Sequence, residues 1–329
     1  MQAGLLGRTG IAVGRLILGC GNFGGVGSLP GLIGRGLDER AAFETLDEAA
    51  ALGLTLLDTA CSYAGGASER MIGHWLARHG AELRRGVRIA TKVGTVVCGA
   101  DIRIDLSPRT MADQLQGSLE RLGLQRVDLC LSHAPDEQLP IEETLEGFAA
   151  LIEAGKVGHI GACNISAVLL RQALDASARL GLPRYEWVQN AYNLMQREDE
   201  AELFAVCREH GLGLTPFSPT AGGVLTGKYR RDAAPPDGSR LSLRSDGAQL
   251  TLRSFDAIDE LRRRAEALGA STGALALAWV MSHRLVTAPI VGPARTGEHL
   301  QLAREALALE LDEAARDELA ALFEVLSIG

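Results

Sequence analysis

Eight short apolar runs, each followed by enough chain for a helix, constrain the fold of this sequence more than any other feature. The runs are Leu16–Gly19, Leu54–Leu57, Val87–Ala90, Val127–Leu131, Val157–Gly161, Trp187–Gln189, Leu212–Pro216 and Val286–Ile290. Short apolar runs are typical of buried strands, and strand–helix alternation repeated eight times favours a parallel barrel over an open sheet. The sequence therefore predicts an α/β fold, a (β/α)8 barrel of the TIM type forming one domain over residues 1–329.

The segments between the runs carry helical signals. Ser107 is a predicted N-cap in front of Pro108, and Leu115, Leu119 and Leu122 then recur at helical spacing. A second helix is indicated by Ile141, Leu145, Phe148 and Ile152, with Gly155 closing it.

The chain also has additions to the plain repeat. They are a hairpin from Gly4–Leu6 and Ile11–Val13, a glycine-rich loop Gly24–Leu37, a long polar loop Gly222–Leu252 and an amphipathic helix Leu311–Leu326. Within the long loop, residues 230–250 fit a surface insertion and a specificity element equally well.

Charge and cysteine usage narrow the class of protein. The net charge of −8 argues against nucleic acid as a partner. Six scattered cysteines, with no Cys-x-x-Cys, suit a reducing compartment. The N-terminal residues do not resemble a signal peptide, and the most apolar helix, Gly273–Ser282, is too short to span a bilayer. We expect a soluble cytoplasmic protein, with its oligomeric state left open.

One motif is misleading. Gly19–Gly24 matches the dinucleotide-binding pattern G-x-G-x-x-G directly after a strand. That motif must lead at once into a helix whose N-terminus holds a pyrophosphate, whereas helical periodicity here starts only near Asp38. The context disfavours a Rossmann domain.

Polar or aromatic residues follow seven of the eight predicted strands, where a parallel barrel places its chemistry. They are Asp58, Lys92, His133, Asn164, Gln189, Phe217 with Ser218, and Arg295. Each alone could be a structural polar group, such as a buried ion pair. Their coincidence at one rim indicates an active site.

These residue types suit proton donation to a carbonyl oxygen. Lys92, paired with Asp58, would lower the pKa of Tyr63 so that the phenol gives its proton as hydride reaches the carbonyl carbon. His133 would hydrogen-bond the same oxygen. The alternatives for His133 are a core hydrogen bond or a metal ligand, but no second ligand stands at metal-binding spacing on its loop, so no metal is expected.

The motifs resemble those of a known family. Asp58–Tyr63 (Asp-Thr-Ala-x-x-Tyr), Thr91–Gly94 and Ser132–Asp136 are similar to the catalytic signatures of the aldo-keto reductases. Further similarity is carried by Gly161–Asn164, Val188–Asn193, Phe217–Pro219, Leu225–Tyr229 and Gly292–Arg295. The resemblance covers the chain from hairpin to final helix and points to the bacterial branch related to potassium-channel β-subunits and sugar dehydrogenases.

The resemblance implies a catalytic tetrad of Asp58, Tyr63, Lys92 and His133, and NADP(H) bound in extended form. Asn164 and Gln189 would bind the carboxamide, Phe217 would stack on the nicotinamide, and Arg295 would hold the 2′-phosphate. The full set of implied cofactor contacts is Gly21, Asn22, Asp58, Cys163, Asn164, Gln189, Phe217, Ser218, Pro219, Thr220, Gly222, Gly223, Leu225, Gly227, Lys228, Gly292, Arg295 and His299. The planar fork of Arg295 suits a phosphate dianion, which favours NADP over NAD.

The chain departs from the family pattern at Cys163, where serine is usual, at His299 and Ala303 beside the adenine, and at Pro293. Two other functions remain open. One is a regulatory NADP-binding subunit on the same barrel, and the other is a metal-dependent hydrolase using Asp58 and His133.

The substrate class is also open. The lining residues expected are Phe23, Leu241–Leu252 and Trp75, although the helical spacing of Trp75 with Ile72 favours the core. A small-molecule carbonyl compound is all that the sequence indicates.

Overall fold

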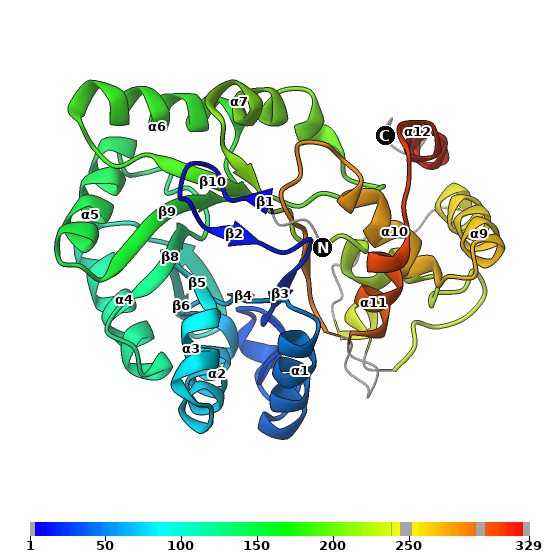
Figure 1. Ribbon diagram of the computed structural model, residues 1–329, viewed down its shortest axis with the longest axis horizontal. Helices are drawn as coiled ribbons and strands as arrows, with labels where there is room; N and C mark the ends of the chain where they lie inside the picture. The colour runs from blue at the N-terminus through cyan, green and yellow to red at the C-terminus, as the bar shows by residue number, and fades with distance from the viewer. Residues whose placement is uncertain (1–3, 238, 244–251, 294–299, 325–329) are drawn as a thin grey trace.

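Eight parallel strands dominate the computed structural model, which describes residues 4–237, 239–243, 252–293 and 300–324 (Figure 1). Their order in the sheet is β11-β10-β9-β8-β5-β4-β3-β12. The strands are β3 (Ile17–Gly19), β4 (Leu56–Asp58), β5 (Arg88–Val93), β8 (Val127–Ser132), β9 (Val157–Cys163), β10 (Tyr185–Gln189), β11 (Gly213–Leu214) and β12 (Ile290–Val291). All eight predicted strands are present.

Backbone hydrogen bonds close the sheet into a barrel. The first strand, β3, pairs with the last, β12. Between β11 and β12, Thr287 N donates to Leu214 O and Ile290 N to Pro216 O, both at 2.8 Å. The predicted (β/α)8 barrel is therefore confirmed, although β12 begins at Ile290 rather than at Val286.

The predicted N-terminal hairpin is also present, as β1 (Gly4–Leu5) paired antiparallel with β2 (Ala12–Val13). It covers the end of the barrel where the strands begin (Figure 1). Leu6 and Val13 are buried in the apolar cluster that fills the barrel, together with Leu56, Leu129 and Trp187. This end is closed by apolar packing, which leaves the opposite end for polar side chains.

Helices surround the barrel and bury a second apolar cluster against its outer face. They are α1 (Glu39–Ala51), α2 (Ala67–Arg78), α3 (Ala81–Gly86), α4 (Pro108–Leu122), α5 (Ile141–Glu153), α6 (Ala167–Leu180), α7 (Leu203–His210), α8 (Arg240–Leu243), α9 (Leu252–Ala267), α10 (Thr272–Met281), α11 (Gln301–Ala308) and α12 (Glu313–Ala321). Single 3-10 turns lie at η1 (Pro30–Leu32), η2 (Tyr63–Gly66), η3 (Glu198–Glu200) and η4 (Ala221–Thr226).

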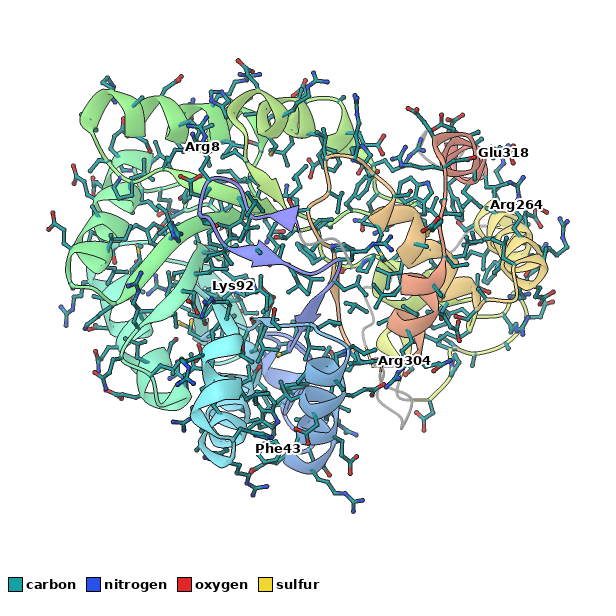
Figure 2. All side chains as sticks on the ribbon, in the orientation of Figure 1. Arg8, Phe43, Lys92, Arg264, Arg304 and Glu318 are labelled. Atoms are coloured by element: carbon teal, nitrogen blue, oxygen red, sulfur yellow. The ribbon has the colours of Figure 1, made fainter. Side chains whose placement is uncertain are left out.

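The two helices predicted from capping and apolar spacing are confirmed as α4 and α5. The Ser107 hydroxyl accepts from Thr110 N at the start of α4, and the three leucines of that helix are buried. The extra C-terminal helix is α12, inside the predicted Leu311–Leu326. Glu318 of α12 forms an ion pair with Arg264 of α9 at 3.0 Å. Figure 2 shows this pair far from the barrel interior that holds Lys92.

A second hairpin was not predicted. Strands β6 (Thr95–Cys98) and β7 (Asp101–Ile104) pair antiparallel directly after β5. Val97 is 40% and Ile102 42% exposed, and in the two strands only Thr95 is buried, so the hairpin gives no core-like periodicity. In the sequence, Gly99 between two β-branched stretches is the feature that indicates this hairpin. Its positive φ of 65° in the structure permits the turn.

The structure agrees with rejection of the dinucleotide motif. Gly19–Gly24 is followed by loop and the single turn η1, and α1 starts only at Glu39, with Asp38 as its N-cap. Within the described part of the chain, no helix combines the length and apolar character needed to cross a membrane.

Candidate active site

Five of the predicted rim residues lie at the same end of the barrel. Asp58 ends β4, Lys92 lies one residue before the end of β5, and Gln189 ends β10. His133 directly follows β8, and Asn164 directly follows β9. Parallel strands bring their carboxyl ends to one edge, which is why residues far apart in the sequence meet here.

Lys92 is the centre of this site and is 1% exposed. Its Nζ donates to Asp58 Oδ1 at 2.6 Å, to Thr59 O at 2.9 Å and to Tyr63 Oη at 3.2 Å. Three acceptors satisfy the three N–H groups of an ammonium. The side chain is therefore held in one direction, with its charge against the tyrosine hydroxyl.

The charges explain the protonation states of this pair. Burial raises the pKa of Tyr63 to about 12, although the Lys92 cation pulls it down. Burial also works to lower the pKa of Lys92, but Asp58 and Tyr63 outweigh it, so this pKa lies above its ordinary value. The predicted lowering of the Tyr63 pKa by Lys92 is present, but desolvation is the larger effect, so the net shift is upward. At neutral pH the phenol is protonated and the amine charged.

His133 lies beside the phenol with its imidazole neutral. Its ring stands edge-on to that of Tyr63, with the centroids 5.5 Å apart. Burial, and then the Lys92 cation, lower the pKa of His133 to about 3. Its Nδ1 is buried without a hydrogen-bond partner. Among the residues that the structure describes, no group of histidine, cysteine and acidic side chains could hold a metal ion.

Replacing His133 with Gln is expected to make the fold less sensitive to acid. Between pH ~6.5 and the folded pKa of about 3, the unfolded chain binds a proton that the folded His133 does not. The free energy of unfolding therefore falls as the pH falls through this window, by about 1.4 kcal/mol per pH unit for one group. Urea unfolding of both proteins at about pH 5 and pH 7 measures this loss. Equal losses would contradict a neutral His133.

A second set of bonds reaches Asp58 from across the rim. Gln189 Nε2 donates to Asp58 Oδ2 at 2.9 Å, and Cys163 Sγ donates to Gln189 Oε1 at 3.0 Å. Burial raises the pKa of Cys163 to about 12, so it is a thiol. Gln189 is 3% exposed and both ends of its amide are engaged inside the chain.

Asn164 has the opposite character, because it is exposed and has a positive φ of 54°. Its Nδ2 donates to His133 O at 2.9 Å. The loop that carries it is fixed by Asn190, whose Oδ1 accepts from Ile165 N at 3.1 Å and whose Nδ2 donates to Ile165 O at 3.0 Å. Asn190 belongs to one of the motifs named above, but no role was predicted for it. The feature that could have indicated one is an amide side chain directly after a buried strand.

Phe217 and Ser218 continue this rim beyond β11. Phe217 is partly exposed and exchanges backbone bonds with Asn190 O and Tyr192 N. Ser218 has a φ of 56°, and its carbonyl accepts from Asn193 Nδ2 at 3.0 Å. Asn193 is a second loop-fixing residue to which the sequence gave no role.

The predicted cofactor loop forms the turn η4. Gly222 (φ 66°) and Gly223 (φ 94°) take conformations that favour glycine. A Cβ on Gly223 would lie 2.6 Å from Lys228 Nζ, so the exposed lysine folds back over the turn. The amides of Gly223 and Leu225 both donate to Thr220 O, and therefore neither is open to a phosphate in this conformation. Pro219 and Gly227 are buried around this turn.

On the other side of the rim, Gly21 passes beside the tyrosine. A Cβ there would lie 3.5 Å from the Tyr63 ring. Asn22 Nδ2 donates to Pro293 O at 3.2 Å, which joins the loop after β3 to the loop after β12 near the exposed Gly292. Arg295 and His299 fall outside the described residues, and Ala303 is buried in α11.

Two of the predicted substrate-lining residues, Phe23 and Trp75, are buried in the core. Phe23 is fully buried, and Trp75 is 1% exposed with its Nε1 donating to Asp47, so both belong to the core. Phe23 was therefore a wrong prediction, because the loop after β3 turns it inward. Most of Leu241–Leu252 lies outside the described residues.

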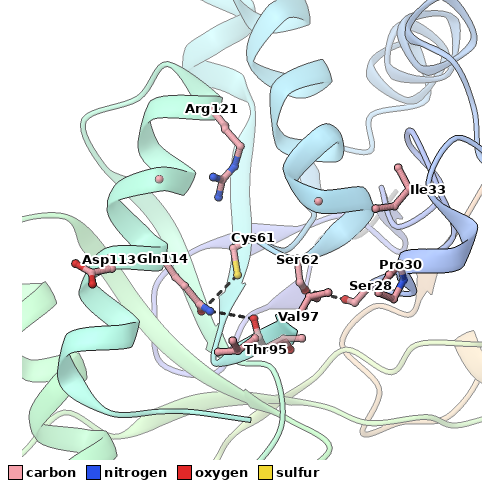
Figure 3. Close-up of a pocket in the computed structure, with 13 residues that line it drawn as sticks. Ser28, Pro30, Ile33, Cys61, Ser62, Thr95, Val97, Asp113, Gln114 and Arg121 are labelled. Atoms are coloured by element: carbon pink, nitrogen blue, oxygen red, sulfur yellow. Dashed lines mark hydrogen bonds between the residues drawn. The ribbon is translucent and has the colours of Figure 1, made fainter. Parts of the chain in front are cut away.

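A cavity of about 410 Å³ lies beside Cys61 and Ser62 (Figure 3). Its walls come from η1 and its flanks, the β6–β7 hairpin, α4, and Cys61 and Ser62. The Gln114 amide binds Cys61 Sγ and Thr95 O across it, and Ser28 bonds Ser62 at 2.7 Å. None of its lining residues is Asp58, Tyr63, Lys92 or His133, so the cavity is separate from the lysine–tyrosine site.

A family model described as the aldo/keto reductase family matches residues 15–324. An uncharacterized oxidoreductase, YrpG, of Bacillus subtilis is 33% identical over 321 residues, which cover 95% of this chain and 93% of the relative. A putative voltage-gated potassium channel subunit beta of Schizosaccharomyces pombe is 31% identical, covering 88% and 83%.

A solved structure shows the same fold. The glycerol dehydrogenase AKR11B4 of Gluconobacter oxydans superimposes with a TM-score of 0.81 over 97% of this chain and 94% of that one, at 23% identity. The lysine–tyrosine site at the mouth of a closed barrel, the family model over nearly the full length and two relatives above 30% identity lead to one conclusion. The chain belongs to the aldo/keto reductase family.

Proposed function

We propose that this protein reduces an aldehyde or ketone to the alcohol with NADPH, using Tyr63 as the general acid. The observation that carries the proposal is the 3.2 Å contact between the Lys92 ammonium and the Tyr63 hydroxyl, with Asp58 fixing the ammonium at 2.6 Å. A buried cation beside a phenol stabilises the phenolate that remains once the proton has left. This contact supports a role for Tyr63 as a proton donor over a plain Lys92–Asp58 ion pair.

The residues at the rim fit a nicotinamide cofactor. Phe217 offers a partly exposed ring, Asn164 an exposed amide, and Ser218 with Gly222 a turn of positive-φ backbone. The unpartnered Nδ1 of His133 indicates a hydrogen bond still to be made at the site. A reduced nicotinamide, when bound there, supplies the hydride. Arg295 and His299, outside the described residues, are proposed contacts on the strength of the resemblance alone.

The chain's own groups handle the proton. Tyr63 donates its hydroxyl proton to the substrate oxygen as that oxygen becomes negative, and the adjacent Lys92 offsets the charge left on the phenol. Asp58 keeps Lys92 charged and aimed at the phenol. His133, being neutral, donates or accepts one hydrogen bond without adding a second positive charge.

The names of the relatives support a carbonyl reductase and also suggest a second function. YrpG is called an oxidoreductase, whereas the fission-yeast relative is called a channel subunit. A regulatory NADP-binding role is therefore the alternative. Loss of NADPH absorbance with a panel of aldehydes and ketones separates the two, because a purely regulatory subunit would bind NADPH without turnover. Stoichiometric zinc or magnesium after dialysis would instead favour a hydrolase.

The choice of NADP over NAD gives a prediction. Arg295→Ala is expected to raise the NADPH dissociation constant about tenfold or more, since a hydrogen bond to a charged group contributes about 1.5–3 kcal/mol. Affinity for NADH should be almost unchanged, because NADH lacks the 2′-phosphate. Titration of nicotinamide fluorescence measures both constants. An equal loss for both cofactors would contradict the assignment.

The proposal extends to the compartment. All six cysteines are described and none pairs with another. This is in keeping with a reducing, cytoplasmic environment, in which we propose that the enzyme acts on a small-molecule carbonyl compound.

A further inference from the structure

We propose that the cavity beside Cys61 and Ser62 is a second ligand site, which takes a small organic carboxylate with an apolar body. In this site Arg121 binds the carboxylate, and the side chains of Ile33 and Val97 contact the apolar body. The cavity volume of about 410 Å³ falls within the range of sites that enclose small molecules. The proposal goes beyond the proposed function and does not depend on it, because the binding is measured without cofactor or carbonyl compound.

One wall of the cavity is apolar and partly open to solvent. It is formed by Pro30 and Ile33 of the loop after β3 and by Val96 and Val97 of the β6–β7 hairpin. Ile33 is 53% and Val97 40% exposed. Large apolar side chains that are exposed around a hollow mark a surface that binds an apolar group. The hairpin, in which only Thr95 is buried, therefore has a role as a binding wall rather than as part of the core.

Arg121 of α4 is the positively charged residue among those that line the cavity. Its Nε donates to Glu69 Oε2 at 2.8 Å and its Nη2 to Ser118 Oγ at 3.3 Å. A guanidinium carries five N–H donors in a planar fork, and Nη1 has no hydrogen-bond partner among the residues that the structure describes. The guanidinium points from α4 toward Cys61 (Figure 3). Arg121 therefore has donors left for an anion in the cavity.

Two glycines make room for this guanidinium. A Cβ on Gly117 would lie 2.9 Å from Arg121 Nη1, and a Cβ on Gly66 would lie 2.7 Å from Arg121 Cδ. The same Cβ on Gly66 would lie 3.2 Å from Arg70 Nη1, so two arginine side chains approach each other at this glycine. Arg70 Nη1 also donates at 3.3 Å to the carbonyl of Gly65, which lines the cavity. The end of the cavity near α2 therefore has two positive charges beside it.

The acidic groups near this end are already compensated. Glu69 is 0% exposed, and its two oxygens accept from Arg121 Nε at 2.8 Å and from Thr91 Oγ1 at 2.6 Å. Asp113 lines the cavity, but its side chain is 76% exposed and lies 3.9 Å from Arg109. The remaining positive charge favours an anion. A carboxylate fits better than a phosphate, because its two oxygens match the planar fork of Arg121 and the rest of the ligand stays apolar.

The site lies next to the proposed proton donor without including it. Cys61 and Ser62 line the cavity, and Tyr63 is the next residue in the chain. Cys61 N donates to Lys92 O at 3.2 Å, which joins the cavity wall to the strand that carries the ammonium. A bound carboxylate therefore contacts the loop that carries Tyr63 but not the tyrosine hydroxyl.

Isothermal titration calorimetry on the cofactor-free wild type tests the proposal with two probes of the same shape, 4-phenylbutyrate and the neutral 4-phenylbutyramide. The carboxylate is expected to bind at least about tenfold more tightly than the amide, because only the carboxylate forms charge-assisted bonds with Arg121. Absence of measurable binding, or equal affinities for the two probes, would overturn the proposal. The result holds whether or not the wild type reduces a carbonyl compound, since that outcome concerns the proposed function alone.

A crystal structure of the complex with 4-phenylbutyrate identifies the occupied site. The expected result is a carboxylate against Arg121 and a phenyl ring against Ile33 and Val97. A probe bound beside Tyr63 and His133 instead would overturn the proposal, because the affinity would then belong to the lysine–tyrosine site.

Three variants separate a specific site from a general effect of charge. Arg121→Lys keeps a cation for Glu69 but removes the planar fork, and it is expected to raise the dissociation constant of 4-phenylbutyrate about tenfold. Ile33→Glu, at a position that is 53% exposed, adds a negative charge to the wall and is expected to raise this constant at least about fivefold. Val168→Glu is the matched control, because Val168 is 64% exposed on α6 and does not line the cavity.

The control variant should bind the probe as tightly as the wild type does. Equal losses in Ile33→Glu and Val168→Glu, or no loss in Ile33→Glu, would contradict a site at this cavity. If Arg121→Lys does not fold, the two glutamate variants still decide the question, because both positions lie at the surface.

Discussion

Tyr63→Phe is expected to lower kcat for carbonyl reduction by at least about 100-fold, because general acid catalysis by a positioned group contributes that much. Phe keeps the ring beside His133 and Gly21 and removes only the hydroxyl that Lys92 contacts. The NADPH dissociation constant should therefore stay close to that of the wild type. Steady-state rates and a fluorescence titration measure the two quantities on the same preparation.

Tyr185→Phe is the matched control for this variant. Tyr185 is equally aromatic, is 1% exposed, begins β10 and packs against Phe148 in the outer apolar cluster rather than against Lys92. It should alter stability but not the chemical step. Near-normal turnover in Tyr63→Phe would mean that the proton comes from another group.

Lys92→Met is expected to lower the free energy of unfolding by about 3–5 kcal/mol and to abolish turnover. The loss arises because Asp58, 4% exposed, would be left as a buried charge without its cation. Urea unfolding at neutral pH measures the loss. Adding Asp58→Asn should restore much of the stability, since the charge is then gone, but none of the activity. A stable single variant, or an active double variant, would contradict the assigned roles.

The sign of the pH effect follows from the same pair. The pKa of folded Lys92 lies above its ordinary value, and that of the unfolded chain is near ~10.4. The contribution of Lys92 to stability is therefore complete below pH ~10.4 and is lost as the pH rises through the folded pKa. In the wild type, the contribution of the Lys92 charge itself should therefore be constant across neutral pH.

The sequence predicted the barrel and the meeting of Lys92 with Tyr63 because both depend on local patterns. Apolar runs define strands, and the ends of parallel strands share one edge. The single-domain assignment over residues 1–329 stays a prediction, as do the contacts of Arg295 and His299. The β6–β7 hairpin was missed because Thr95 is the one buried residue in its two strands, so they lack a core-facing period.

Two features of the site depend on distance and burial, which a sequence does not give. The pKa of Tyr63 is set by how much desolvation opposes Lys92, and the balance appeared only with the packing around the phenol. The bond from Gln189 to Asp58 joins strands that are not neighbours, so no pattern within either strand could indicate it. Phe23 looked like a pocket residue from its loop position but is fully buried.

Transfer of deuterium from NADPH that carries two deuterium atoms at C4 of the nicotinamide to the carbonyl carbon of an aldehyde tests the central claim most directly. Mass analysis of the alcohol is expected to find one deuterium in the wild-type product. Tyr63→Phe should form that product at least about 100-fold more slowly. An unlabelled alcohol would contradict hydride transfer from the nicotinamide, and an equal rate from the variant would contradict a lysine-supported tyrosine as the proton donor.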